Sequence, residues 1–147
     1  MNFSYITCSP KQTRELGMAW AKKIIQRRKG IVLALEGDLG GGKTTFLQGF
    51  ARGLNIRDRI MSPTFVIVKK FPIPHPSFEF FFHIDCYRIE EEKELISLGV
   101  KEILSSPQNI VALEWAERIQ NLLPPGTLRV RFKFYNFNKR IITLKNV

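Results

Sequence analysis

Two kinds of hydrophobic pattern alternate along the chain. Short apolar or alternating runs, typical of β-strands, lie at residues 2–7, 31–35, 61–69, 78–85, 109–114, 128–134 and 140–145. Apolar residues at helical spacing lie between them, at residues 10–28, 43–54, 89–98 and 115–123. This alternation predicts an α/β protein with three layers and a mixed, mainly parallel sheet. The last two strand-like runs predict a C-terminal antiparallel hairpin.

A continuous apolar strand leads into the sequence GDLGGGKTT at residues 37–45. Gly37, Gly42, Lys43 and Thr44 match the spacing G-x-x-x-x-G-K-[ST], in which main-chain N–H groups surround phosphate oxygens. We expect Lys43 to reach the terminal phosphates and the Thr44 hydroxyl to bind Mg²⁺. The alternative is a glycine-rich structural turn. The strand before the loop and the helical spacing after it favour a P-loop NTPase-like fold.

Two predicted strands end in a carboxylate. Asp85 ends the run at residues 78–85, and Glu114 ends the run at residues 109–114. If both strands lie parallel to the strand before the glycine loop, the two acids emerge at the same edge of the sheet, where they can bind Mg²⁺ or orient the attacking water. The alternative is that they are surface charges at strand ends. His83 is more often a structural hydrogen-bonding residue than a base in such a position.

Two threonines are further candidates. Thr13 lies on the predicted helix at residues 10–28, whose inner face would also hold Leu16, Trp20 and Ile24. The pattern alone favours a surface position for Thr13 over one near a nucleotide. Thr64 follows Pro63, which precludes helix, so its hydroxyl could face a γ-phosphate or Mg²⁺ as in switch loops.

Composition places the chain among single-domain proteins. Its 147 residues, 44% of them hydrophobic, suffice for one domain with a real core, which we expect over residues 1–147. No apolar run is long enough to span a bilayer, and the first residues lack the pattern of an export signal. Cys8 and Cys86 are more typical of reduced thiols than of a disulfide or metal site. These features predict a cytoplasmic protein with no membrane partner.

The net charge of +10 is concentrated at the two ends of the chain. The first 30 residues hold seven Lys or Arg and one Glu, and the last 30 hold seven Lys or Arg and no acid. Such basic ends suit an anionic partner, either RNA or an acidic protein. The alternative is that the charge serves solubility alone.

Several separated motifs together resemble the TsaE family, formerly YjeE, of bacterial P-loop ATPases. The resemblance covers nearly the whole chain and includes Gly41, where alanine is common in the family. The motifs that carry it, in order, are Ser9-x-x-x-Thr13-x-x-Leu16-Gly17, the loop from Gly37 to Thr45, Ser62-Pro63-Thr64-Phe65, His83-x-Asp85-x-Tyr87-Arg88, Leu98-Gly99 and Glu114-Trp115-x-Glu117.

This resemblance implies an ATPase that uses ATP and Mg²⁺ and supports threonylcarbamoyladenosine formation on tRNA with two partner proteins, TsaB and TsaD. It also implies roles for residues beyond those that the spacing alone indicates. The residues that would hold nucleotide are Asp38, Leu39, Gly40, Gly41, Gly42, Lys43, Thr44 and Thr45, with Thr13 and Glu117 as second candidates. The metal residues would be Thr44, Glu114 and Asp85, and Thr64 would lie in a switch-like segment.

Two other functions remain as alternatives. A small P-loop kinase would need an acceptor site and a closing lid, for which hardly any unassigned sequence remains. The second alternative is a nucleotide-sensing module in which hydrolysis is incidental and the basic ends bind RNA. It overlaps with the hypothesis of an ATPase that supports tRNA modification.

Overall fold

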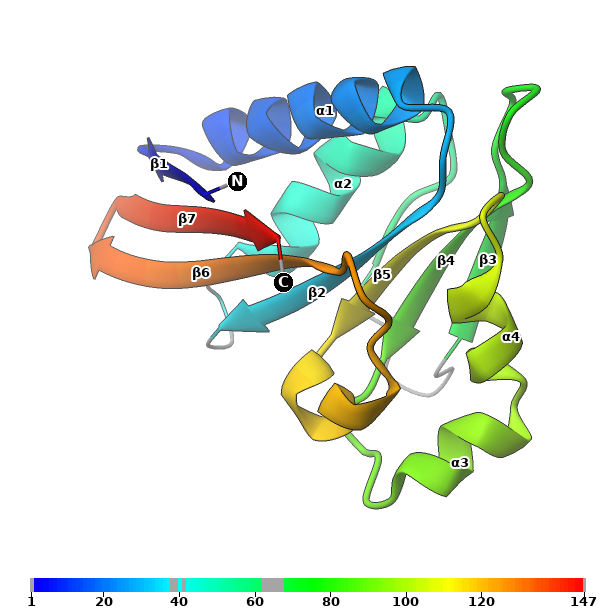
Figure 1. The fold of residues 1–147 in the computed structure, drawn as a ribbon. Coiled ribbons are helices and arrows are strands. Elements are labelled where there is room, and N and C mark those ends of the chain that lie inside the picture. The colour runs from blue at the N-terminus through cyan, green and yellow to red at the C-terminus, as the bar shows by residue number, and fades with distance from the viewer. Residues whose placement is uncertain (1, 38–39, 41, 62–67, 147) are drawn as a thin grey trace.

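A mixed sheet lies at the centre of the protein (Figure 1). The fold is that of a computed structural model, which describes residues 2–37, 40, 42–61 and 68–146. Within these residues the sheet has seven strands in the order β1-β7-β6-β2-β5-β4-β3. The strands are β1 (Asn2–Thr7), β2 (Ile31–Gly37), β3 (Val68–Pro72), β4 (Phe80–Asp85), β5 (Ile110–Glu114), β6 (Leu128–Asn136) and β7 (Lys139–Asn146).

The central strands of the sheet are parallel. β2 pairs in parallel with both β6 and β5, and β5 pairs in parallel with β4. At the margins the pairing is antiparallel, between β6 and β7, β7 and β1, and β4 and β3. The predicted α/β class, mixed sheet and C-terminal hairpin are therefore confirmed. Because β2, β5 and β4 are parallel, their carboxyl ends lie at one edge of the sheet.

Helices on the two faces of the sheet complete the three layers (Figure 1). One face is covered by α1 (Pro10–Gln26) and α2 (Lys43–Gly53). On the other face, α3 (Glu92–Ser97), α4 (Val100–Ser105) and the 3₁₀ helix η1 (Ala116–Leu122) pack with β2, β4 and β5. None of these helices is long and apolar enough to cross a membrane, and the same holds for every helix in the described part of the chain.

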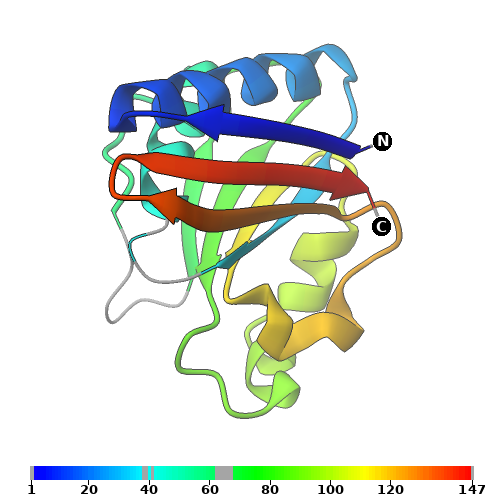
Figure 2. The same cartoon turned by 90° about the vertical axis from the view of Figure 1, so that its left-hand side faces the viewer.

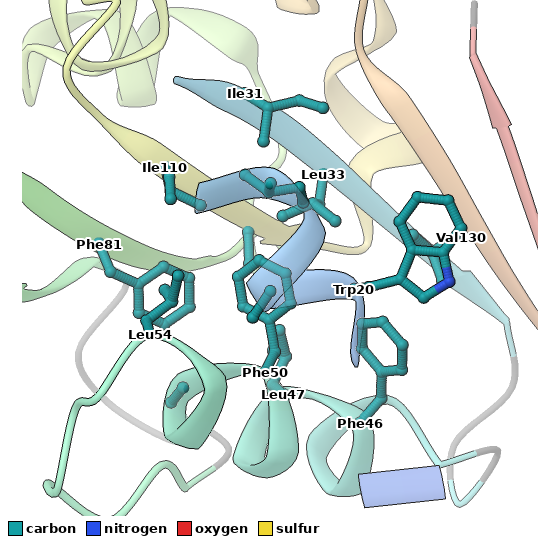
Figure 3. Packing of buried hydrophobic residues seen from close by; sticks show 14 of the residues in the cluster. Trp20, Ile31, Leu33, Phe46, Leu47, Phe50, Leu54, Phe81, Ile110 and Val130 are labelled. Carbon is teal, nitrogen blue, oxygen red and sulfur yellow. The ribbon is translucent and has the colours of Figure 1, made fainter. Parts of the chain in front are cut away.

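The larger core lies between the sheet and the two long helices. Phe46, Leu47 and Phe50 project from α2 toward Leu33 of β2 and Val130 of β6 (Figure 3). All five side chains are fully buried, so each contributes the full free energy of removing its apolar surface from water. This packing fixes the first turn of α2 against the carboxyl end of β2.

Close contact between α1 and α2 depends on small residues. A Cβ atom on Gly49 would overlap the carbonyl oxygen of Arg14, and one on Gly17 would overlap the carbonyl oxygen of Phe46. Gly17 and Ala21 are therefore buried in α1, whereas Leu16, predicted for the inner face, is only half-buried. The hydrophobic pattern misses these positions because glycine carries no apolar side chain to mark them.

We predict that Gly49→Ala destabilises the protein by about 3 kcal/mol, because the backbone of α1 must move to admit one methyl group. Urea unfolding followed by circular dichroism measures the change. Lys22→Ala, at an exposed position of α1, is the matched control and should change stability by less than about 0.5 kcal/mol. Equal stabilities for Gly49→Ala and wild type would show that the two helices are not in this contact.

Several element boundaries differ from the sequence pattern. The helix predicted at 89–98 begins only at Glu92, and a separate helix, α4, follows it. β4 begins at Phe80 and not at residue 78, because the N–H of Phe78 closes a turn by donating to the carbonyl of His75 at 3.2 Å. The helix predicted at 115–123 is a 3₁₀ helix interrupted by non-helical backbone geometry at Ile119, with φ −133° and ψ 36°. The strand predicted at 61–69 is described only from Val68, and residues 62–67 lie outside the described part.

Both cysteines are free thiols, as predicted. Burial raises the pKa of Cys86 to about 12, so this thiol remains protonated at neutral pH. Cys8 is exposed.

Candidate functional site

A cavity of about 880 Å³ lies at the carboxyl ends of the central strands. It is bounded by the glycine loop and the start of α2, by the ends of β5 and β1, and by the β6–β7 hairpin. Its lining residues are Cys8, Ser9, Pro10, Thr13, Gly40, Gly42, Lys43, Thr44, Thr45, Glu114, Trp115, Phe134, Phe137, Asn138 and Arg140. Six of the predicted nucleotide-binding residues therefore share one cavity with Glu114.

Lys43 is the buried cation of this cavity. Its Nζ donates to the carbonyl oxygen of Gly37 at 2.6 Å and lies 4.4 Å from the centroid of the Trp115 ring. The residue is only 5% exposed. A buried ammonium group with one carbonyl acceptor retains donor capacity for an anion, because Lys Nζ carries three N–H groups. Its position also concentrates positive potential where α2 begins.

The start of α2 adds main-chain donors to the same region. Gly42 precedes the helix with a φ of 102°, a conformation that glycine adopts without strain and other residues rarely adopt. The first N–H groups of any helix have no acceptor within that helix, and here they belong to residues that line the cavity, Lys43, Thr44 and Thr45. Together with the helix dipole, they form a binding site suited to phosphate.

Glu114 is held by a buried hydrogen bond. Its Oε2 lies 2.6 Å from Nε2 of His83, and the two residues are 3% and 0% exposed. An ionised carboxylate can only accept, so Nε2 is the protonated nitrogen when Glu114 is charged. His83 therefore orients the carboxylate, as expected of a structural hydrogen-bonding residue. Within the described residues, His83 Nδ1 has no hydrogen-bond partner.

Asp85 lies beside Glu114, as predicted from the strand ends. The two residues are direct partners in the parallel pairing of β4 and β5. Oδ1 of Asp85 accepts from the N–H of Tyr87 at 2.9 Å. Partial burial raises the pKa of Asp85 above its usual value, and the nearby charge of Glu114 raises it further. Asp85 does not line the cavity itself, so it adjoins the site from the side of Glu114.

The raised pKa of Asp85 predicts how the stability of the folded protein depends on pH. A folded-state pKa above the usual 3.8 means that the folded protein binds the proton more tightly, so stability falls as pH rises through the interval between the two values. Asp85→Asn removes the charge and retains an acceptor for Tyr87. We expect it to raise the melting temperature at pH 7 in the presence of EDTA, with the gain disappearing as the pH approaches 4.

Thermal unfolding at several pH values tests this prediction. Asp58→Asn, at an exposed position, is the matched control and should have no comparable gain. If Asp85→Asn and wild type had equal melting temperatures at pH 7, burial of the Asp85 charge would not destabilise the folded protein, and the prediction would be wrong.

Thr13 is buried and not at the surface, which corrects the interpretation that its pattern favoured. It is 3% exposed, lines the cavity, and shares a hydrogen bond of 2.8 Å between its Oγ1 and Oγ1 of Thr7. Thr13 is buried because β1 lies beside α1 at this point, so that the Thr13 hydroxyl faces the hydroxyl of Thr7 and not solvent. Thr13 is therefore near the site, as the family resemblance implies.

Besides Asp85, five predicted residues are not placed in the cavity. Asp38, Leu39, Gly41 and Thr64 lie outside the described residues. Glu117 is exposed, on η1, and does not line the cavity. Its contact with nucleotide remains a prediction.

The motifs alone do not identify the part of the cavity wall that the β6–β7 hairpin supplies. Phe134, Phe137, Asn138 and Arg140 come from the β6–β7 hairpin, and the Arg140 guanidinium lies 3.9 Å from the centroid of the Phe134 ring. No local signal marks these residues, because they reach the cavity only through the parallel pairing of β6 with β2. Trp115, by contrast, could be identified from the sequence as a cavity residue, because it directly follows Glu114, a predicted strand-end acid.

The strand, glycine loop and helix around Lys43, with acids at the ends of the neighbouring parallel strands, define a protein of P-loop NTPase-like architecture. Comparison with known proteins identifies the family. The family model for threonylcarbamoyl adenosine biosynthesis protein TsaE matches residues 7–142. The chain belongs to the TsaE family.

Individual relatives agree. The tRNA threonylcarbamoyladenosine biosynthesis protein TsaE of Bacillus subtilis is 39% identical, with 96% of this chain and 84% of the relative covered. The protein of the same name from Rickettsia bellii is 34% identical, with 99% and 96% covered. The crystal structure of Bacillus subtilis YdiB superimposes with a TM-score of 0.77 at 32% identity, covering 100% of this chain and 86% of the other.

Proposed function

We propose that this protein is a Mg²⁺-dependent ATPase that supports threonylcarbamoyladenosine formation on tRNA, beside the anticodon. The observation that carries the proposal is the position of Lys43: a buried ammonium group at the start of α2, within a cavity that also contains Glu114. Relatives at 39% and 34% identity are named for tRNA threonylcarbamoyladenosine biosynthesis, which supports the biological role.

The residues of the cavity fit a nucleoside triphosphate. Lys43, the N-terminal N–H groups of α2 and the hydroxyls of Thr44 and Thr45 are donors, as phosphate oxygens require. The cavity of about 880 Å³ lies within the usual range for small-molecule sites. Lys43 and the helix dipole would stabilise negative charge that develops on the terminal phosphate. Half-buried Trp115 and buried Glu114 limit the access of water to that end of the cavity.

The acids at the strand ends fit Mg²⁺. This ion commonly binds through one or two carboxylates together with substrate phosphates, and it supplies charge neutralisation between them. The Thr44 hydroxyl and the Glu114 carboxylate line the same cavity, and Asp85 adjoins Glu114. We propose Thr44 and Glu114 as metal residues, with Asp85 acting directly or through water. His83 would hold the Glu114 carboxylate in place.

The proposed partners are TsaB and TsaD, which would carry out the transfer of the threonylcarbamoyl group to tRNA. In this assignment ATP hydrolysis supports turnover of the assembly, in the cytoplasm. Among the described arginines, Arg140 lines the cavity but packs on the Phe134 ring, and we assign no arginine to the transferring phosphate. We therefore expect slow hydrolysis by the isolated protein.

Phosphate release with ATP and Mg²⁺ tests the proposal directly. It is measured for the protein alone, with TsaB and TsaD, and with both partners and tRNA. We expect hydrolysis to increase when the partners are present and to require Mg²⁺. Transfer of phosphate to a small acceptor would instead indicate a kinase, and nucleotide binding with no turnover in any mixture would indicate a sensor.

A further inference from the structure

One face of the sheet carries a cluster of basic side chains. Helices α1 and α2 cover the inward side of β6, β7 and β1, and in Figure 2 no helix crosses in front of these strands. Because side chains alternate along a strand and direct partners share a side, the outward residues can be assigned from the register. They form what we call the open face: Arg129, Arg131 and Lys133 of β6, Ile141, Thr143 and Lys145 of β7, and Asn2, Ser4 and Ile6 of β1.

A shallow hollow of about 310 Å³ lies on the open face. The residues that line it all carry hydrogen-bond donors: Asn2, Arg129, Arg131, Thr143, Lys145 and Asn146. Three of them are cations, and no carboxylate is among them. This donor set suits an anion such as a phosphate group.

Glu36 of β2 orients two of these cations. Its carboxylate pairs with Nη1 of Arg129 and, at 3.0 Å, with Nε of Arg131. The Arg131 side chain is nevertheless 68% exposed, so the outer edge of its guanidinium faces solvent. A guanidinium held along one edge needs little further ordering before it binds phosphate with the other. Lys133 and Lys145 are exposed and extend the basic surface around it.

We propose that the open face binds the phosphate backbone of an RNA, with one phosphate in the hollow beside Arg131. The cluster is rich in lysine as well as arginine, whereas protein interfaces are depleted of lysine. Exposed aromatic rings lie at the β6–β7 hairpin: Tyr135, near the end of β6, is 62% exposed, and Phe137, in the turn where it also lines the nucleotide cavity, is 92% exposed. Such rings provide a stacking surface for unpaired bases, which an acidic protein surface does not use.

The test is the binding of a fluorescein-labelled tRNA transcript, followed by anisotropy between 50 and 200 mM salt as an order-of-magnitude range. The variant Arg131→Gln/Lys133→Gln/Lys145→Gln removes three charges from the open face and leaves the Arg129–Glu36 pair intact. The matched control, Lys11→Gln/Arg14→Gln/Lys22→Gln, removes one arginine and two lysines from exposed positions of α1. Circular dichroism confirms that both variants are folded.

For the open-face variant we expect affinity to fall about tenfold or more, and the slope of log affinity against log salt to decrease by roughly 2 to 3, because about three phosphate contacts are lost. The slope for the control should differ from the wild-type slope by no more than the loss of about one phosphate contact would cause. Equal losses in both variants would overturn the proposal, since net charge alone would then explain binding. Absence of binding at the lowest salt would overturn it as well.

An acidic protein partner is the competing occupant, and polyglutamate is the probe for it. Polyglutamate binding that is lost in the open-face variant, with tRNA binding unchanged, would overturn the RNA assignment. The proposal does not depend on ATP hydrolysis. We therefore expect Lys43→Met, which alters only the nucleotide cavity, to bind tRNA as wild type does.

Discussion

Replacing Lys43 should reduce phosphate release by about 100-fold or more, the scale of effect found when one buried charge-stabilising group is removed from an active site. Two variants separate chemistry from packing. Lys43→Met retains most of the aliphatic chain beside Trp115, and Lys43→Ala removes it. Both lose the ammonium group, so both should lose hydrolysis. Phosphate release is measured at saturating Mg²⁺ with the partner proteins present.

Lys101→Ala is the control for this result, because Lys101 is an exposed lysine on α4, outside the residues that line the cavity. We expect its hydrolysis rate to equal that of wild type within about twofold. If Lys43→Met released phosphate at the wild-type rate while folded, the cavity would not be where phosphoryl transfer is catalysed.

Glu114→Gln should reduce hydrolysis by about 100-fold and leave the fold intact. The amide oxygen of Gln can still accept a hydrogen bond from His83, but a neutral amide is a poor ligand for Mg²⁺. Glu114→Ala should lose hydrolysis and, in addition, about 1–3 kcal/mol of stability, because fully buried His83 Nε2 would then have no acceptor. The measurements are phosphate release over a series of Mg²⁺ concentrations and urea unfolding.

The matched control for this pair is Glu102→Gln, which changes an exposed glutamate of α4. We expect neither its activity nor its stability to change. If Glu114→Gln hydrolysed ATP at the wild-type rate at every Mg²⁺ concentration, Glu114 would not be a metal ligand. This conclusion would hold whatever the stability of Glu114→Ala.

Much of the site could be predicted from the sequence because its parts follow local rules. A continuous apolar strand, a glycine loop and a helical pattern are contiguous in the chain, so Lys43 and Thr44 were identified from spacing. Asp85 and Glu114 were identified because each ends an apolar strand. The parallel pairing that brings them together was assumed, and the register of β4 and β5 confirms it.

The rest of the cavity depends on interactions between distant segments. The β6–β7 hairpin reaches the site because β6 pairs with β2, and neither strand carries a sequence signal for that pairing. Thr13 is buried because Thr7, at the end of another element, accepts or donates the hydrogen bond that Thr13 needs. Gly17 and Gly49 are essential for helix contact because they lack side chains, so a hydrophobic pattern cannot identify them.

The central claim is that nucleotide binds in the cavity that contains Lys43. The chain has two tryptophans, and Trp115 lines that cavity while Trp20 lies in the core. In a Trp20→Phe variant, fluorescence therefore reports on Trp115 alone. Titration with ATP and Mg²⁺ should give a saturable change in emission, which Lys43→Met abolishes or moves to much higher concentration. Unchanged Trp115 emission at concentrations where calorimetry detects ATP binding would place the nucleotide elsewhere and contradict the claim.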